Sequence, residues 1–125
     1  MSQPPDRSAP ILIVDDDPDM CWALQYILHK HGFPTEKVLN GLQALESVRS
    51  RHFSLVFLDA KLPDLDGLEV ASLIRRTDPE SRIIIVSGYF YRDDLAIRQA
   101  PAAGLVQGFL SKPFLLEEIL NALKI

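Results

Sequence analysis

The sequence of 125 residues has little of several features that mark particular classes of protein. It contains one cysteine, Cys21, which excludes an internal disulfide and fits a reducing compartment. Its formal net charge is −4, whereas binding to nucleic acid phosphates needs a basic surface. No apolar run is long enough to cross a membrane, and residues 1–10 lack the apolar core of a signal peptide. We therefore expect a cytoplasmic protein that contacts neither membranes nor nucleic acid directly.

The remaining composition is that of one globular domain, with 47% hydrophobic and 24% charged residues. Residues 1–9 are polar and contain two prolines, which predicts a flexible tail ahead of a domain that spans residues 10–125. Continuous apolar runs at 11–14, 53–59 and 82–87 are typical of strands that are buried on both faces.

Weaker strand patterns at 33–39 and 108–111 complete a set of five strands, each followed by a helical pattern. Pro34 favours an edge position for 33–39. The expected helices start at Pro18 with Asp17 as the cap, at 41, at 67, at Asp93 or Asp94, and after Phe114. Strands that alternate with helices predict an α/β fold with a parallel sheet covered on both faces.

Polar residues follow or end four of these strands, and the carboxyl ends of parallel strands share one edge of the sheet. The residues are Asp15, Asp16, Asp59, Ser87 and Lys112. Two carboxylates about 4 Å apart repel by roughly 4 kcal/mol at an effective dielectric constant near 20. Lys112 and a hard cation such as Mg²⁺ (or Mn²⁺) would compensate for this repulsion. An aspartate beside a metal, a lysine and a hydroxyl predicts a phosphoryl acceptor, with Asp59 as the nucleophile.

Four motifs in this order resemble the receiver domain of two-component response regulators, the CheY-like family. They are Val-Asp-Asp-Asp-Pro at 14–18, Leu-Asp at 58–59 with Leu-Pro-Asp-Leu-Asp-Gly at 62–67, Val-Ser-Gly at 86–88, and Phe-Leu-Ser-Lys-Pro-Phe at 109–114. The resemblance implies a flavodoxin-like, doubly wound (βα)5 domain with strand order 2-1-3-4-5.

The same resemblance implies a role for each residue of the site. Asp59 would accept a phosphoryl group from a sensor histidine kinase or a phosphotransfer protein. Asp16 would bind Mg²⁺ directly, Asp15 largely through water, and Lys61 through its backbone carbonyl. Three further residues would act on the phosphorylated form: Ser87 by a hydrogen bond to the phosphoryl group, Lys112 by an ion pair with it, and Phe109 as the switch aromatic that follows Ser87.

By this resemblance the protein is a switch that catalyses its own phosphorylation and dephosphorylation, not an enzyme with a separate substrate. The face of the fourth helix, fifth strand and fifth helix would signal to an output domain or effector protein, or form a phosphorylation-dependent homodimer. Pro101 and the segment between Gly104 and Phe109, which is about one residue longer than the common family pattern, leave the choice of partner open. Lys61 and Tyr89, two residues after Asp59 and Ser87, are expected to crowd the attacking water and slow hydrolysis.

Two other functions stay open at this point. A docking module with the same fold would not use phosphorylation, and a flavodoxin-like cofactor binder would need a phosphate-cradling loop where three aspartates stand. Several residues have simpler interpretations: we expect Cys21 and Trp22 to be packing residues, and His29, His31 and His52 to lie on the surface. The sequence does not decide between a stand-alone receiver and a fragment of a larger regulator.

Overall fold

The structure, a computed structural model, describes residues 9–88, 104–112 and 114–123. Its centre is a five-stranded sheet of parallel strands in the order β2-β1-β3-β4-β5, which confirms the predicted topology. The strands are β1 (Ile11–Val14), β2 (Thr35–Val38), β3 (Leu55–Asp59), β4 (Arg82–Ser87) and β5 (Gly108–Ser111).

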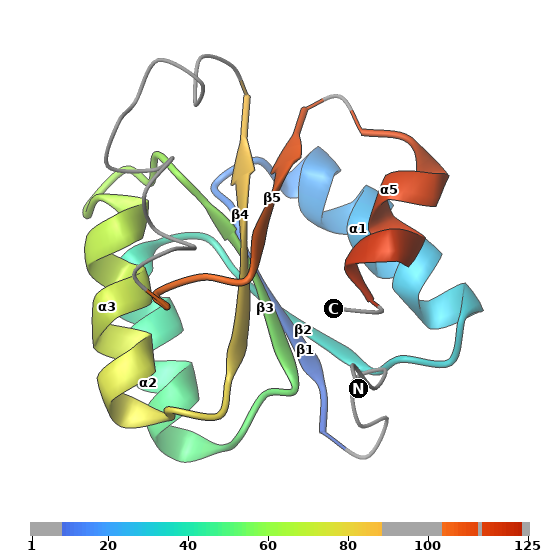
Figure 1. The fold of residues 1–125 in the computed structure, drawn as a ribbon. Helices are drawn as coiled ribbons and strands as arrows, with labels where there is room; N and C mark the ends of the chain where they lie inside the picture. Colours follow the sequence, from blue (N-terminus) through green and yellow to red (C-terminus); the bar gives the residue numbers. More distant parts are fainter. Residues whose placement is uncertain (1–8, 89–103, 113, 124–125) are drawn as a thin grey trace.

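Four helices are described, and they cover both faces of the sheet. They are α1 (Pro18–Lys30), α2 (Gly41–Ser50), α3 (Gly67–Thr77) and α5 (Leu116–Ala122). Figure 1 shows α2 and α3 on one face of the sheet and α1 and α5 on the other. The doubly wound, flavodoxin-like α/β fold is therefore confirmed. The helix predicted to begin at Asp93 or Asp94 and the predicted tail at 1–9, except Ala9, lie outside the described residues.

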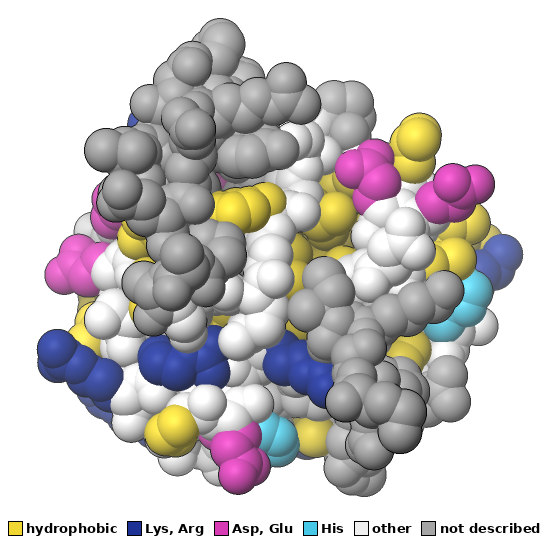
Figure 2. Space-filling view, viewed as in Figure 1, with side chains coloured by type: hydrophobic (Ala, Val, Ile, Leu, Met, Phe, Trp, Pro, Cys, Tyr) yellow, Lys and Arg dark blue, Asp and Glu magenta, His cyan; other side chains and the backbone are white. Residues whose placement is uncertain are grey.

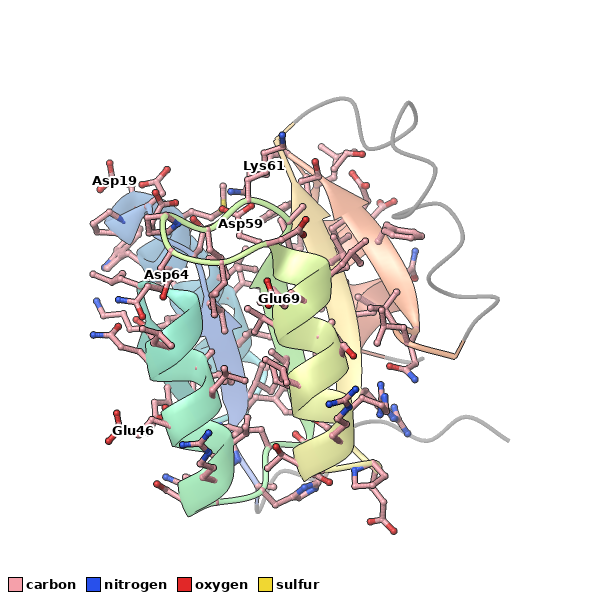
Figure 3. The ribbon with its side chains drawn as sticks, turned by 90° about the vertical axis from the view of Figure 1, so that its left-hand side faces the viewer. Asp19, Glu46, Asp59, Lys61, Asp64 and Glu69 are labelled. Atoms are coloured by element: carbon pink, nitrogen blue, oxygen red, sulfur yellow. The ribbon has the colours of Figure 1, made fainter. Side chains whose placement is uncertain are left out.

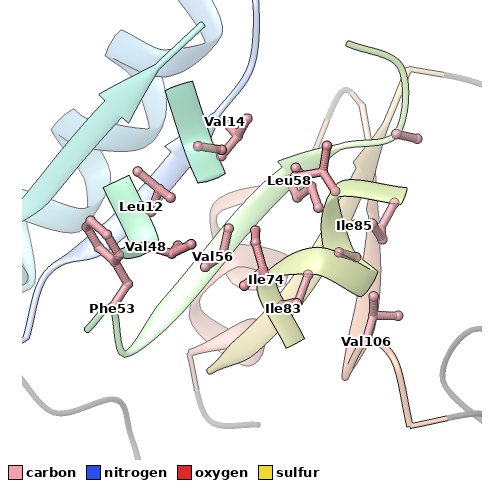
Figure 4. Packing of buried hydrophobic residues seen from close by; sticks show 14 residues of the cluster. Leu12, Val14, Val48, Phe53, Val56, Leu58, Ile74, Ile83, Ile85 and Val106 are labelled. Carbon is pink, nitrogen blue, oxygen red and sulfur yellow. The ribbon is translucent and has the colours of Figure 1, made fainter. Parts of the chain in front are cut away.

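The continuous apolar runs are explained by two hydrophobic cores, one on each face of the sheet. Alternate residues of a strand point to opposite faces, so Leu12 and Val14 join the core under α2 and α3, whereas Ile11 and Ile13 join the other. Figure 4 shows the first of these cores, in which Val56 and Leu58 of β3 lie among side chains of the neighbouring elements. A strand buried on both faces has no polar alternation, which is why its polar ends stand out in the sequence.

Strand β2 lies at the edge of the sheet, as the proline predicted, and it is shorter than the expected 33–39. Phe33 is buried ahead of the strand, and the carbonyl of Pro34 accepts a hydrogen bond from the Ile11 amide at 2.9 Å. The cap prediction for α1 is confirmed, because the Asp17 side chain accepts a hydrogen bond from the Asp19 amide.

The interpretation of Trp22 as a packing residue is wrong. Its side chain is 64% exposed and stacks on Tyr26, with ring centroids 5.5 Å apart. The buried stripe of α1 runs through Cys21, Leu24 and Leu28. A helix turns by about 100° per residue, so the neighbour of a buried cysteine faces away from the core. Within the described residues, no helix is both long and apolar enough to cross a membrane.

Gly67, the first residue of α3, brings that helix directly against the end of β3. A Cβ atom on Gly67 would lie 2.4 Å from the carbonyl oxygen of Asp59 and 2.8 Å from the Cα atom of Ala60. The Gly67 amide donates a hydrogen bond to the Ala60 carbonyl at 3.0 Å. Because these neighbours are backbone atoms, no side-chain rotation can make room for a methyl group.

The variant Gly67→Ala should therefore lower the free energy of unfolding by about 2–3 kcal/mol, the cost of overpacking a close contact. The control is Gly88→Ala, whose Cβ atom would meet nothing within 4 Å, and which should stay within about 0.5 kcal/mol of the parent. Urea unfolding of the three proteins measures this difference. Equal unfolding midpoints for Gly67→Ala and Gly88→Ala would contradict the close contact.

Candidate functional site

The strand register brings the predicted site residues together at the carboxyl edge of the sheet. Val14 pairs with Leu58, so Asp15 and Asp59 leave their strands side by side. Asp59 pairs with Val86, one position before Ser87. The Lys112 amide donates a hydrogen bond to the carbonyl of Ser87 at 2.8 Å. Neighbouring strands in the order β1-β3-β4-β5 thus deliver acid, acid, hydroxyl and amine to one edge.

Three carboxylates form the acidic part of the site. Asp15, Asp16 and Asp59 each offer one oxygen, and these oxygens all lie within 4.8 Å of one another. Asp15 and Asp59 are buried, whereas Asp16 is exposed. One oxygen of each buried carboxylate is fixed by a backbone amide: Oδ1 of Asp15 accepts from Asp17 at 3.0 Å, and Oδ1 of Asp59 accepts from Lys61 at 3.2 Å.

Among the described residues, Lys112 is the cation that lies against the buried carboxylates. Its Nζ atom donates a hydrogen bond to Oδ2 of Asp15 at 2.7 Å and lies 3.7 Å from Oδ2 of Asp59. Burial by itself would lower the pKa of Lys112, but the hydrogen bond that Lys112 donates to Asp15 and the charge of Asp59 outweigh it and raise that pKa. The ammonium therefore stays charged at neutral pH. Its single positive charge is smaller than the combined negative charge of the three neighbouring carboxylates.

The excess of negative charge acts on Asp59. Burial is the largest cause that raises the pKa of Asp59, to about 6, and the charge of Asp15 adds to the increase. The amide of Lys61 and the charge of Lys112 lower this pKa only in part. Figure 2 shows a row of Lys and Arg side chains across the lower part of the face in view. This row lies at the opposite end of the sheet from the carboxyl ends of the strands.

The donor set fits a small, hard divalent cation. Carboxylate oxygens are the ligands that Mg²⁺ prefers, and Mg²⁺ uses few protein ligands and keeps several waters. Beside the carboxylates lies a pocket of about 210 Å³, lined by Asp59, Lys61, Ser87, Gly88 and Lys112. Through this pocket a small anion could reach Asp59 from one side, where it would lie between Lys112 and Ser87.

Two further predicted site residues lie within the described part of the chain, and one lies outside it. The side chain of Lys61 is exposed and lines the pocket, and Phe109 of β5 is half-buried against the core under α2 and α3. Tyr89 lies outside the described residues, as does Pro101. The predicted packing role of Cys21 is confirmed: its side chain is buried, and burial together with the charge of Asp15 raises the pKa of its thiol to about 11.

One residue near the site had no role in the sequence prediction. Asp64, in the loop between β3 and α3, accepts hydrogen bonds from the amides of Gly41 and Leu42 at the start of α2. These partners of Asp64 are more than 20 residues away in the chain. No local pattern in the sequence could have indicated this contact.

Comparison with known proteins agrees with this geometry. The model of the family described as the response regulator receiver domain matches residues 11–124. The chain is 37% identical over 114 residues to sporulation initiation phosphotransferase F of Bacillus subtilis, an alignment that covers 91% of this chain and 90% of the relative. It is 34% identical over 117 residues to the response regulator MprA of Mycobacterium ulcerans, covering 94% of this chain and 49% of that longer protein.

A solved structure supports the same assignment. The chain superposes on the response regulator protein TrrA of Thermotoga maritima, which was crystallised in complex with Mg²⁺-BeF, with a TM-score of 0.80 and 32% sequence identity. The superposition covers 93% of this chain and 96% of the other. From the match over residues 11–124 together with these relatives, we conclude that the chain belongs to the response regulator receiver domain family.

Proposed function

We propose that the protein is a cytoplasmic phosphorylation switch, in which Asp59 accepts a phosphoryl group from a sensor histidine kinase or a phosphotransfer protein. The observation that carries this proposal is the ammonium of Lys112, which lies 2.7 Å from Asp15 and 3.7 Å from Asp59 within a cluster of three carboxylates. The net negative charge of this cluster would attract a metal cation, and the ammonium of Lys112 could pair with the transferred phosphoryl group.

In the transfer step, a carboxylate oxygen of Asp59 attacks the phosphorus atom of the donor. The new O–P bond forms while the P–N bond of a phosphohistidine breaks, the leaving imidazole takes up a proton, and an acyl phosphate remains on Asp59. One oxygen of Asp59 is held by the Lys61 amide, and the other faces Lys112, which would pair with an oxygen of the phosphoryl group. Phosphoryl transfer needs little more than this positioning and charge stabilisation.

Asp16, Asp15, Asp59 and the backbone carbonyl of Lys61 would hold Mg²⁺, with Mn²⁺ as a substitute. When bound, the ion supplies positive charge to the oxygens of the transferring group. The Mg²⁺-BeF complex of the TrrA receiver supports this expectation for a structure of the same fold. Burial is the largest cause of the raised pKa of Asp59, and the ion would offset the further contribution from the charges of Asp15 and Asp16.

The signal would leave the site through Ser87 and Phe109. Ser87 would donate a hydrogen bond to the phosphoryl group and shift toward it, and Phe109 would turn inward to fill the space. The positions of the two residues support this route, because Phe109 pairs with Ile85, two residues before Ser87 on the neighbouring strand. The predicted face of the fourth helix, β5 and α5 would then signal to an output domain, an effector protein or a second copy of the chain.

Acetyl phosphate with Mg²⁺ tests the proposed acceptor. The protein should gain the mass of one phosphoryl group, Asp59→Asn should gain none, and Lys112→Ala should react about a hundredfold more slowly because it lacks one charge on the transferring group. The control is Glu46→Gln, an exposed carboxylate lower down on α2 (Figure 3), which should react as the parent does. No mass gain, or an equal gain in Asp59→Asn, would contradict the proposal and favour a docking module that does not use phosphorylation.

Hydrolysis of the acyl phosphate tests the roles of Lys61 and Tyr89. Lys61 lines the pocket beside Asp59, so its side chain would hinder the water that attacks phosphorus. The phosphorylated parent should outlive a Lys61→Ala, Tyr89→Ala double variant several-fold, as measured by release of inorganic phosphate. The single Lys61→Ala variant should fall between the two. Equal decay rates in all three proteins would rule out this tuning.

A further inference from the structure

The tip of the β3–α3 loop is tied to a different helix by one side chain. Oδ1 of Asp64 accepts the amide of Gly41 at 2.8 Å, and Oδ2 accepts the amide of Leu42 at 3.0 Å. The next amide of α2, that of Gln43, donates to the side chain of Asn40 at 2.9 Å. The first amides of a helix have no partner within the helix. Here Asp64 supplies two of the partners from more than 20 residues away.

The same loop is fixed at its two ends. Lys61 and Asp66 form an antiparallel bridge across its base. At the entrance, the Lys61 amide donates to Oδ1 of Asp59 at 3.2 Å. At the exit, Asp66 caps α3 by accepting the Leu68 amide at 2.9 Å. The loop therefore connects the predicted acceptor, the start of α3 and, through Asp64, the start of α2.

Packing reinforces the contact between the tip and α2. Leu65 follows Asp64 and lies so close to Gly41 that a Cβ atom there would be 3.0 Å from Cδ1 of Leu65. Figure 3 shows Asp64 at the upper end of α2, and Asp59 and Lys61 at the upper edge of the sheet. The hydrogen bonds from the Gly41 and Leu42 amides lower the pKa of Asp64, so its carboxylate is charged where the positive end of the helix dipole favours it.

We propose that Asp64 is a positioning residue for the metal site: it holds the β3–α3 loop against α2 and thereby keeps the backbone of Lys61 in place beside Asp59. This inference rests on the proposed function, in which the Lys61 carbonyl is a metal ligand. Asp64 itself is exposed and would not bind the ion. It acts through the loop whose second residue, Lys61, would supply the backbone carbonyl to the ion.

The physical reason is the conformational entropy of the loop. A backbone that is already fixed loses little freedom when it binds a ligand, whereas a free loop must be ordered at a cost of about 1–2 kcal/mol per residue in backbone entropy. Without the contact between Asp64 and α2, the bridge and the amides of Ala60 and Lys61 would still hold the entrance of the loop, but its tip would lose both hydrogen bonds to α2. Binding of Mg²⁺ would then have to order the loop, and its affinity would fall.

The test measures Mg²⁺ affinity from the rise in melting temperature during a MgCl₂ titration of the full chain. Asp64→Ala should bind Mg²⁺ about three- to tenfold more weakly, below the 10–100-fold typical of residues that contact a metal ligand directly. Asp64→Asn keeps one acceptor oxygen and should lie between Asp64→Ala and the parent. Glu69→Gln removes one exposed negative charge from the same loop region, where Glu69 lines a pocket with Lys61 and Asp64, and should match the parent.

Amide hydrogen exchange by NMR supplies a second readout. In Asp64→Ala, exchange should quicken at Gly41 and Leu42, and also at Lys61, whose amide is bound to Asp59. Mg²⁺ affinities that are equal in Asp64→Ala and Glu69→Gln would overturn the inference, because charge alone would then explain any effect. Faster exchange at Gly41 and Leu42 with unchanged Lys61 exchange and unchanged affinity would also overturn it, leaving Asp64 as a helix cap only.

Failure of the proposed function gives a different result. If the parent protein itself shows no Mg²⁺-dependent stabilisation and takes up no phosphoryl group from acetyl phosphate, then the metal site is wrong. If the parent does both and Asp64→Ala does so with unchanged affinity, only the positioning role is wrong.

Discussion

The ammonium of Lys112 between Asp15 and Asp59 is the interaction on which the site depends. It pairs closely with Asp15 at 2.7 Å and more loosely with Asp59 at 3.7 Å. One cation cannot neutralise three carboxylates whose oxygens lie within 4.8 Å, and the surplus of negative charge contributes to the raised pKa of Asp59. The folded domain therefore presents a carboxylate that gains from any added positive charge, whether from a metal ion or from pairing with the lysine during transfer.

The rest of the fold serves to hold this cluster together. Parallel strands with cores on both faces place Asp15, Asp59, Ser87 and Lys112 at one edge, because neighbouring strands end there in register. Gly67 lets α3 approach the backbone of Asp59 without a gap. The repulsion within the cluster is offset by the burial of two apolar cores, which is the dominant favourable contribution to folding.

Much of this could be predicted from the sequence because the signals are local. Apolar runs that end in Asp15, Asp59 and Ser87 mark both the strands and the edge at which they end. Trp22 differs from the prediction because it lies next to the buried stripe of α1 and is not part of it. The contact of Asp64 with α2 could not be predicted, since it depends on how two helices and a loop pack together and no spacing in the sequence encodes it.

The most direct test of this account is the pKa of Asp59, measured by NMR titration of its side-chain carboxyl carbon with and without Mg²⁺. In metal-free protein the carboxyl should titrate near pH 6, since burial and the neighbouring carboxylates disfavour the charged form. Because Mg²⁺ binds only the carboxylate form, saturating Mg²⁺ should move this pKa well below its metal-free value. A pKa near the ordinary value of about 4 in metal-free protein, or one that Mg²⁺ leaves unchanged, would contradict the account.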